Sequence, residues 1–234
     1  MNKFFVIHYL ALTLLLFYPA MPAFPSETQK PATWTVDDVL LHLKERQGTL
    51  ATFIAKFKQI QKNSLFDQPQ VSEGTLFFDH NGKLLMKMTT PEVYLVFITD
   101  QKMIMGVPGS PSYRQKNLPG RNIFFKRVMG IGQSVDQLKN QYDIQMITTP
   151  CKKTCELRLT PLKKSRRTPF ASIRATINTL QWLPETIQLE ETEDDLTTFH
   201  LRFTSINQPL PDRIFDIPLP DKKAHRPEGY HDIK

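Results

Sequence analysis

Six histidines and two cysteines are the side chains of this 234-residue sequence best suited to catalysis. Three of the histidines lie near the chain ends, and His42, His80 and His200 have no serine or thiol motif beside them that an imidazole could activate. Neither glycine-rich nucleotide motif, GxGxxG or GxxxxGK[ST], occurs, and neither HExxH nor GxSxG is present. We therefore expect a protein that is not an enzyme and that binds no metal or other cofactor.

Two clusters of charged residues are the next candidates for a binding site. The basic cluster, with seven cations and the single acid Glu156, comprises Lys152, Lys153, Arg158, Lys163, Lys164, Arg166 and Arg167. It could face anionic headgroups or an acidic partner, although a solvated hairpin is the simpler interpretation. The acidic run at residues 190–195 is a weak candidate for a metal site and is more typical of a hairpin tip.

The first 23 residues have the pattern of a secretory signal. Lys3 precedes an apolar run over residues 4–17, and small residues with two prolines follow it, so we expect cleavage after Ala23. An uncleaved anchor is the alternative, because Met21 occupies a position where a smaller residue is preferred. No cysteine precedes Cys151, which argues against a lipid-modified N-terminus. We expect a soluble periplasmic protein of net charge +6 that does not meet nucleic acid.

Cys151 and Cys155 suit an exported chain. Two cysteines in an oxidising compartment most simply form one disulfide, here closing a five-residue loop. A redox pair is the alternative, but the CxxxC spacing is not the CxxC of redox motifs. The sequence predicts a structural disulfide.

Downstream of a flexible lead at residues 24–33, the apolar pattern predicts one helix and then mostly strands. Thr35 is the expected helix cap, with two aspartates in the first turn. From Phe53 the period changes to two, which indicates a strand, and Asn81-Gly82 between two alternating runs predicts a hairpin over residues 74–88. Residues 122–140 are helical in pattern. Further strands are expected over residues 94–99, 102–107, 142–149, 156–162, 173–180, 186–191, 196–203 and 214–220.

This order of elements predicts a mainly β protein with some helix. About ten strands without a repeating strand–helix–strand pattern favour a single curved antiparallel sheet, with helices laid over one face. The apolar content of 40% is sufficient for a packed core, and five of the 18 prolines border expected strands.

Several segments in this order resemble the outer-membrane lipoprotein carrier family, LolA. The resemblance covers residues 34–220, leaving a polar tail at 221–234. It rests on residues 49–59, 72–76, 89–91, 98–100, 157–161, 203–207 and 213–218. The hairpin tip departs from the family pattern: where the family usually has Arg-Pro, this sequence has His80-Asn81. In the family that arginine helps to hold a closed lid and is coupled to cargo transfer. With His80 in its place, the cargo or the partner contacts of this chain could differ from those of the family.

The resemblance implies an unclosed antiparallel barrel that is covered by helices and encloses an apolar cavity. It further implies a monomeric carrier of lipoprotein acyl chains, which receives them from an inner-membrane ABC-type exporter and delivers them to an outer-membrane acceptor. The residues expected to face the cavity are Phe53, Phe57, Leu76, Phe78, His80, Leu84, Met86 and Met88, together with Ile123, Phe124, Val128 and Met129 on a candidate lid helix. From the pattern alone such stripes are more often plain core.

Two other functions remain open at this point. A LolA-like carrier of a different exported lipid or glycolipid fits His80 and the basic cluster. A lipoprotein-sensing module on a related half-barrel is the third reading, although residues 221–234 are too few for the second domain that such sensors usually carry.

Overall fold

The computed structural model describes residues 34–64, 67–110, 113–117, 135–147, 151–163, 170–191 and 195–217. The chain divides into two compact units, residues 1–32 and 33–234, and everything described below belongs to the second. The expected signal peptide, lead and C-terminal tail therefore lie outside the described residues, as do Ile123, Phe124, Val128 and Met129 of the candidate lid helix.

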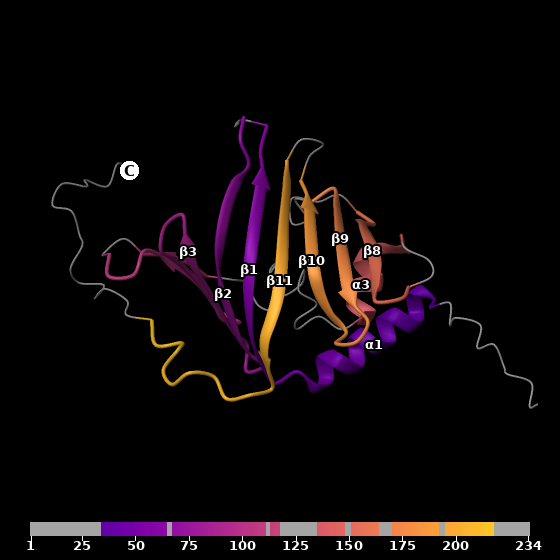
Figure 1. Cartoon of the computed structure of the whole chain (residues 1–234), viewed down its shortest axis with the longest axis horizontal. Helices are drawn as coiled ribbons and strands as arrows, with labels where there is room; N and C mark the ends of the chain where they lie inside the picture. The colour runs from indigo at the N-terminus through magenta and orange to yellow at the C-terminus, as the bar shows by residue number, and fades with distance from the viewer. Residues whose placement is uncertain are drawn as a thin grey trace, which may run out of the picture. The chain divides into compact units, whose positions relative to one another are not determined.

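The described part of this unit contains a single antiparallel sheet of eleven strands (Figure 1). Its order is β6-β5-β4-β3-β2-β1-β11-β10-β9-β8-β7, and the two edge strands β6 and β7 do not pair, so the barrel is unclosed as expected. The strands are β1 Thr52–Lys62, β2 Gln70–Asp79, β3 Lys83–Thr90, β4 Tyr94–Ile98, β5 Lys102–Gly106, β6 Arg114–Asn117, β7 Tyr142–Met146, β8 Thr154–Pro161, β9 Ser172–Asn178, β10 Leu183–Glu190 and β11 Leu196–Ile206.

Two helices are described, α1 Val36–Thr49 and α3 Val135–Gln141, and both lie beside the β7–β10 half of the sheet (Figure 1). The Thr35 side chain accepts a hydrogen bond from the Asp38 amide at 3.2 Å, and the Asp38 carboxylate accepts one from the Thr35 amide at 2.8 Å. This reciprocal capping box fixes the start of α1 where the sequence predicts it. Neither described helix has the length and apolar run that crossing a bilayer requires.

The predicted hairpin at Asn81-Gly82 is present between β2 and β3. Residues 80–82 form its loop, and Gly82 has a φ of +91°, which a side chain rarely adopts. A Cβ at this position would also lie 2.6 Å from Oδ2 of Asp100. The backbone angle of the turn therefore favours glycine, and any other residue here would also displace the Asp100 carboxylate.

The sheet buries apolar side chains on both faces. The larger cluster runs along the inner face, where Phe53, Leu76, Leu84 and Ile187 are almost fully buried. On the outer face, a smaller cluster combines Leu85, Leu95, Phe97 and Ile104 of β3–β5 with Ile214, Phe215 and Ile217 of the C-terminal segment.

Two expectations about the strands are wrong. Of the strand expected at 214–220, only residues 214–217 are described, and they form no strand: residues 212–215 form turns, and the apolar side chains of 214–217 pack over β4, with the rings of Phe97 and Phe215 5.9 Å apart. Conversely, β6 falls inside the proline- and glycine-containing segment at 108–120 that the sequence leaves without an element. Its four residues are all exposed, so no apolar alternation marks it.

Candidate functional site

An apolar cavity lies between α1, α3 and the inner face of β7–β10. Its volume is about 70 Å³. Its lining consists of Leu40, Leu43, Arg46, Gln47, Leu50, Val135, Leu138, Tyr142, Ile144, Leu157, Leu159, Ile173, Ala175, Ile177, Trp182, Leu183 and Pro184. Nearly all of these side chains are aliphatic or aromatic, so the cavity suits a hydrocarbon ligand rather than a polar one.

The sequence of each element explains how it reaches the cavity. On α1, Leu40, Leu43 and Gln47 follow the spacing that keeps residues on one side of a helix. On β9, Ile173, Ala175 and Ile177 occupy alternate positions, which places them on one face of the strand. Helix and sheet thus each contribute one apolar side to the same enclosed space.

The expected disulfide between Cys151 and Cys155 is present and packs against α1. Both cysteines are buried, at 6% and 0% exposure, and they pack with Val39, Leu40 and Leu157. The disulfide therefore packs in one buried cluster with α1, and neither cysteine lines the cavity.

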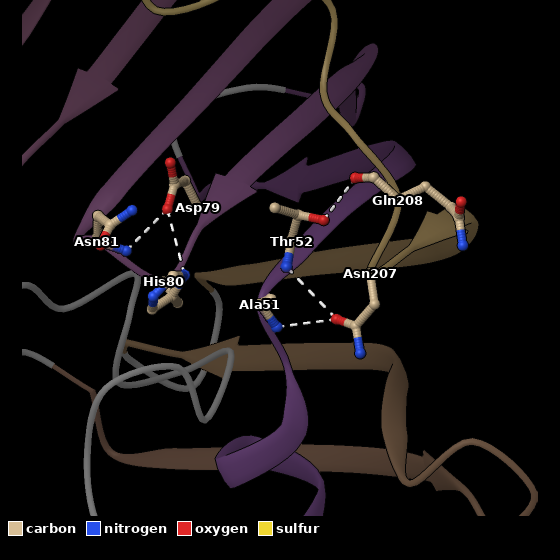
Figure 2. A network of polar contacts seen from close by, with 7 residues as sticks. All are labelled: Ala51, Thr52, Asp79, His80, Asn81, Asn207 and Gln208. Carbon is tan, nitrogen blue, oxygen red and sulfur yellow. Dashed lines mark hydrogen bonds and ion pairs between the residues drawn. The ribbon is translucent and has the colours of Figure 1, made fainter.

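The C-terminal end of α1 is tied to the sheet through Asn207 (Figure 2). The Asn207 side-chain oxygen accepts hydrogen bonds from the amides of Ala51 at 2.8 Å and Thr52 at 3.4 Å. Its side-chain nitrogen donates to the carbonyl of Thr49 at 2.7 Å. Thr52 in turn donates from its hydroxyl to the carbonyl of Gln208 at 2.7 Å. These bonds fix the residues that connect α1 to β1.

The predicted cavity residues of the β1–β3 region lie elsewhere on the inner face. They belong to the packed core on that face. The predicted residues found there are Phe53, Phe57, Leu76, Phe78, Leu84 and Met86, which are buried, and Met88, which is partly buried. None of them lines the cavity beneath α1. Their role in binding a ligand therefore remains a prediction.

His80 is at the tip of the β2–β3 hairpin and is 61% exposed. Its ring nitrogen Nδ1 lies 3.5 Å from a carboxylate oxygen of Asp79 (Figure 2). The His80 amide donates to the carbonyl of Ala51 at 2.8 Å. The hairpin tip therefore touches the same α1–β1 connection that Asn207 holds. His80 does not line the cavity.

Sequence reasoning missed the residues that actually surround the cavity. The helical spacing on α1 and the alternation on β8 and β9 were visible signals, but nothing in them shows that α1 covers those strands. Arg46 and Gln47 carry no apolar signal at all.

The charged clusters are only partly described. Lys152, Lys153 and Lys163 are exposed. Arg158 on β8 is half-buried and lies opposite Arg174 of the neighbouring strand β9. From the acidic run, Asp195 accepts a hydrogen bond from the Ser64 amide at 2.8 Å. Among the described residues no three acidic, histidine or cysteine side chains are grouped as metal ligands would be.

The described part of the chain is an unclosed antiparallel half-barrel with an apolar cavity under a helix. The particular family follows from the sequence: residues 48–218 match the family of the outer membrane lipoprotein carrier protein LolA, and the chain belongs to that family. The fold is that of a binding and carrier family, as the resemblance implied.

Solved structures resemble the chain at low sequence identity. A LolA superfamily protein from Nitrosomonas europaea is 11% identical, with a TM-score of 0.40 over 78% of this chain and 97% of that one. Mycobacterium tuberculosis lipoprotein LppX is 9% identical, with a TM-score of 0.40 over 76% and 99%. MucB, in the Pseudomonas aeruginosa MucA/MucB complex, is 13% identical, with a TM-score of 0.44 over 75% and 59%. No curated protein matches the chain in sequence.

Proposed function

We propose that this protein is a periplasmic carrier that shields the acyl chains of lipoproteins. It would receive them from an inner-membrane ABC-type exporter and deliver them to an outer-membrane acceptor, without performing catalysis. The observation that carries the proposal is the apolar cavity beneath α1 in a member of the LolA family.

The physical need for such a cavity is large. At about 0.8 kcal/mol per CH2, an acyl chain of about fifteen methylenes is less stable in water than in an apolar environment by roughly 12 kcal/mol. A flat surface patch leaves half of the chain in water. A cavity closed by a helix can surround it.

The cavity must expand to admit such a chain. Its volume of about 70 Å³ is well below the roughly 300–1,000 Å³ of typical ligand pockets. The described element best placed to move is α1. Asn207 holds its C-terminal end by hydrogen bonds, whereas side-chain packing and one ion pair near its start hold the rest of the helix. Movement of α1 about residues 50–51 would open the cavity and keep the helix attached.

The salt bridge between Lys139 of α3 and Asp37 of α1 offers little resistance to this movement. Its atoms are 2.6 Å apart, but the side chains are 47% and 77% exposed. Exposed ion pairs contribute about 0–1 kcal/mol, so helix packing and not charge sets the stability of the closed form.

The direct test is to purify the protein from its own periplasm and to identify co-purifying molecules by mass spectrometry. The proposal predicts acylated lipoproteins bound one to one. Recovery of only free lipids would contradict the lipoprotein cargo, and recovery of no acylated molecule, together with no uptake of an acyl probe in vitro, would contradict the carrier function itself.

A further inference from the structure

One side chain in the cavity lining carries a charge. Arg46, in the last turn of α1, stands beside Gln47 at the edge of an otherwise apolar lining. No acidic residue is among the described residues that line the cavity, so nothing in the lining balances the guanidinium charge.

The Nε atom of Arg46 is buried and has no hydrogen-bond partner in the part of the chain that the structure describes. A buried N–H group that loses water without gaining an acceptor is unfavourable, and such groups are rare in folded proteins. A cation in the last turn of a helix does interact favourably with the helix dipole. That interaction accounts for a basic residue near the end of α1, but an arginine extended into solvent would satisfy it equally well. The buried Nε needs a separate explanation.

We propose that the cavity binds an amphiphile with one acyl chain and an anionic head, and that Arg46 binds the head. The proposal rests on the proposed function only for the burial of an acyl chain beneath α1, and it adds a second class of ligand, single-chain amphiphiles with an anionic head. A carboxylate or phosphate would accept hydrogen bonds from the guanidinium, including its Nε, in the paired geometry that favours arginine over lysine. Gln47 would supply a further donor from the next position on α1.

The arrangement gives the ligand a direction. Arg46 and Gln47 lie at the C-terminal end of α1, near the connection that Asn207 fixes, while Leu40 and Leu43 line the cavity toward the start of the helix. The head is then held at the anchored end of α1 and the acyl chain extends beneath the part of the helix that moves.

The test compares ligands of equal chain length and different heads. Dodecanoate, dodecyl phosphate and 1-dodecanol are titrated against the purified protein lacking residues 1–23, in competition with a neutral fluorescent acyl probe. Acetate and inorganic phosphate serve as heads without chains. We expect both anionic amphiphiles to bind at least about tenfold more tightly than the alcohol, and the two chain-free anions not to compete at the same concentrations.

Variants at position 46 assign the preference to one side chain. Arg46→Gln is expected to abolish the tenfold preference by weakening the binding of both anionic amphiphiles far more than that of 1-dodecanol, whereas Arg46→Lys retains part of the preference. The control is Lys44→Gln, which removes one positive charge from an exposed position on the same helix and should keep the preference.

The possible failures are distinct. Equal binding of all three chains overturns the anionic head but leaves the acyl carrier intact. An equal loss of alcohol and carboxylate binding in Arg46→Gln assigns Arg46 a structural role and overturns the inference. Competition by phosphate alone identifies a free-anion site and also overturns it. Failure of every chain to bind contradicts the inference and the proposed carrier function together.

Discussion

The imidazole ring of His42 on α1 stacks on the indole ring of Trp182 in the turn between β9 and β10, with ring centroids 4.2 Å apart and planes 18° from parallel. Trp34 meets both rings edge-on, at 5.0 Å from His42 and 5.4 Å from Trp182. Because Trp182 also lines the cavity, this aromatic cluster joins the covering helix directly to the cavity wall. The backbone of Trp182 has a φ of +52°, which a tryptophan adopts only when its surroundings fix it.

Removing the indole should therefore loosen α1. Trp182→Ala is expected to lower the free energy of unfolding by about 1–3 kcal/mol, since each aromatic pair contributes about 0.5–1.5 kcal/mol beyond the area it buries. Hydrogen exchange should accelerate in the amides of α1 more than in those of β1 and β2. Leu180→Ala, in the same turn but 87% exposed, is the control. Equal protection of α1 in the two variants would show that the cluster does not hold the helix.

The capping box at the start of α1 gives a stability change that depends on pH. Two hydrogen bonds with Thr35, the side-chain one having the larger effect, lower the pKa of Asp38 below its ordinary value of 3.8. A lowered folded-state pKa stabilises the fold above pH 3.8, and this stabilisation disappears as the pH falls through the folded-state value. Thr35→Ala should cost about 1 kcal/mol at pH 7 and less at pH 3, while Thr35→Ser should be nearly neutral. Chemical denaturation at both pH values measures this. A penalty that is unchanged at pH 3 would mean that Asp38 does not contribute.

Asn207 combines an anchor with an unusual backbone. Its φ is +55°, and its side chain makes three hydrogen bonds to the α1–β1 connection. We expect Asn207→Ala to destabilise the protein by about 1–3 kcal/mol, because each hydrogen bond contributes about 0.5–1.5 kcal/mol and alanine disfavours positive φ. Asn207→Gly loses the same bonds but tolerates the backbone, so it should be less destabilised in urea unfolding. If the two variants were equally stable, the loss of the hydrogen bonds alone would account for the destabilisation and the positive φ would not contribute.

The disulfide should contribute more to stability, through its buried packing, than closure of its five-residue loop alone would give. Closure of so short a loop contributes about 2 kcal/mol. Because Cys151 and Cys155 are buried beneath α1, a double change to serine also places two hydroxyls in an apolar environment. The double alanine variant should therefore lose about 2–4 kcal/mol, and the double serine variant more. Thermal unfolding of both compares them, and a serine variant as stable as the alanine variant would refute the packing role.

Local sequence patterns predicted the local structures well. The Thr35 cap, the Asn81-Gly82 hairpin and the alternation from Phe53 each depend on neighbours within a few residues, and each is present. Residues 214–217 show why alternation can mislead. Ile214, Phe215 and Ile217 are partly buried against the outer face without joining the sheet. A segment that packs in this way has the same apolar pattern as a strand.

The cavity could not be located from the sequence for a different reason. Leu76 on β2 and Ile173 on β9 both face inward and both belong to the inner core, yet only Ile173 lines the cavity. The distinction depends on where α1 lies across the sheet. That placement follows from contacts distant in sequence, such as Trp182 with His42 and Asn207 with Thr49.

The central claim is that an acyl chain binds beneath α1, and two leucines of that helix test it most directly. Leu43 lines the cavity, whereas Leu41 is 54% exposed. Binding of a neutral fluorescent acyl probe is measured for Leu43→Glu and Leu41→Glu, after thermal unfolding confirms that both are folded. Ala175→Leu fills the cavity from β9 without adding charge. The account predicts at least about tenfold weaker binding for Leu43→Glu and for Ala175→Leu, with Leu41→Glu close to the wild-type protein. Equal affinity in all four proteins would contradict it.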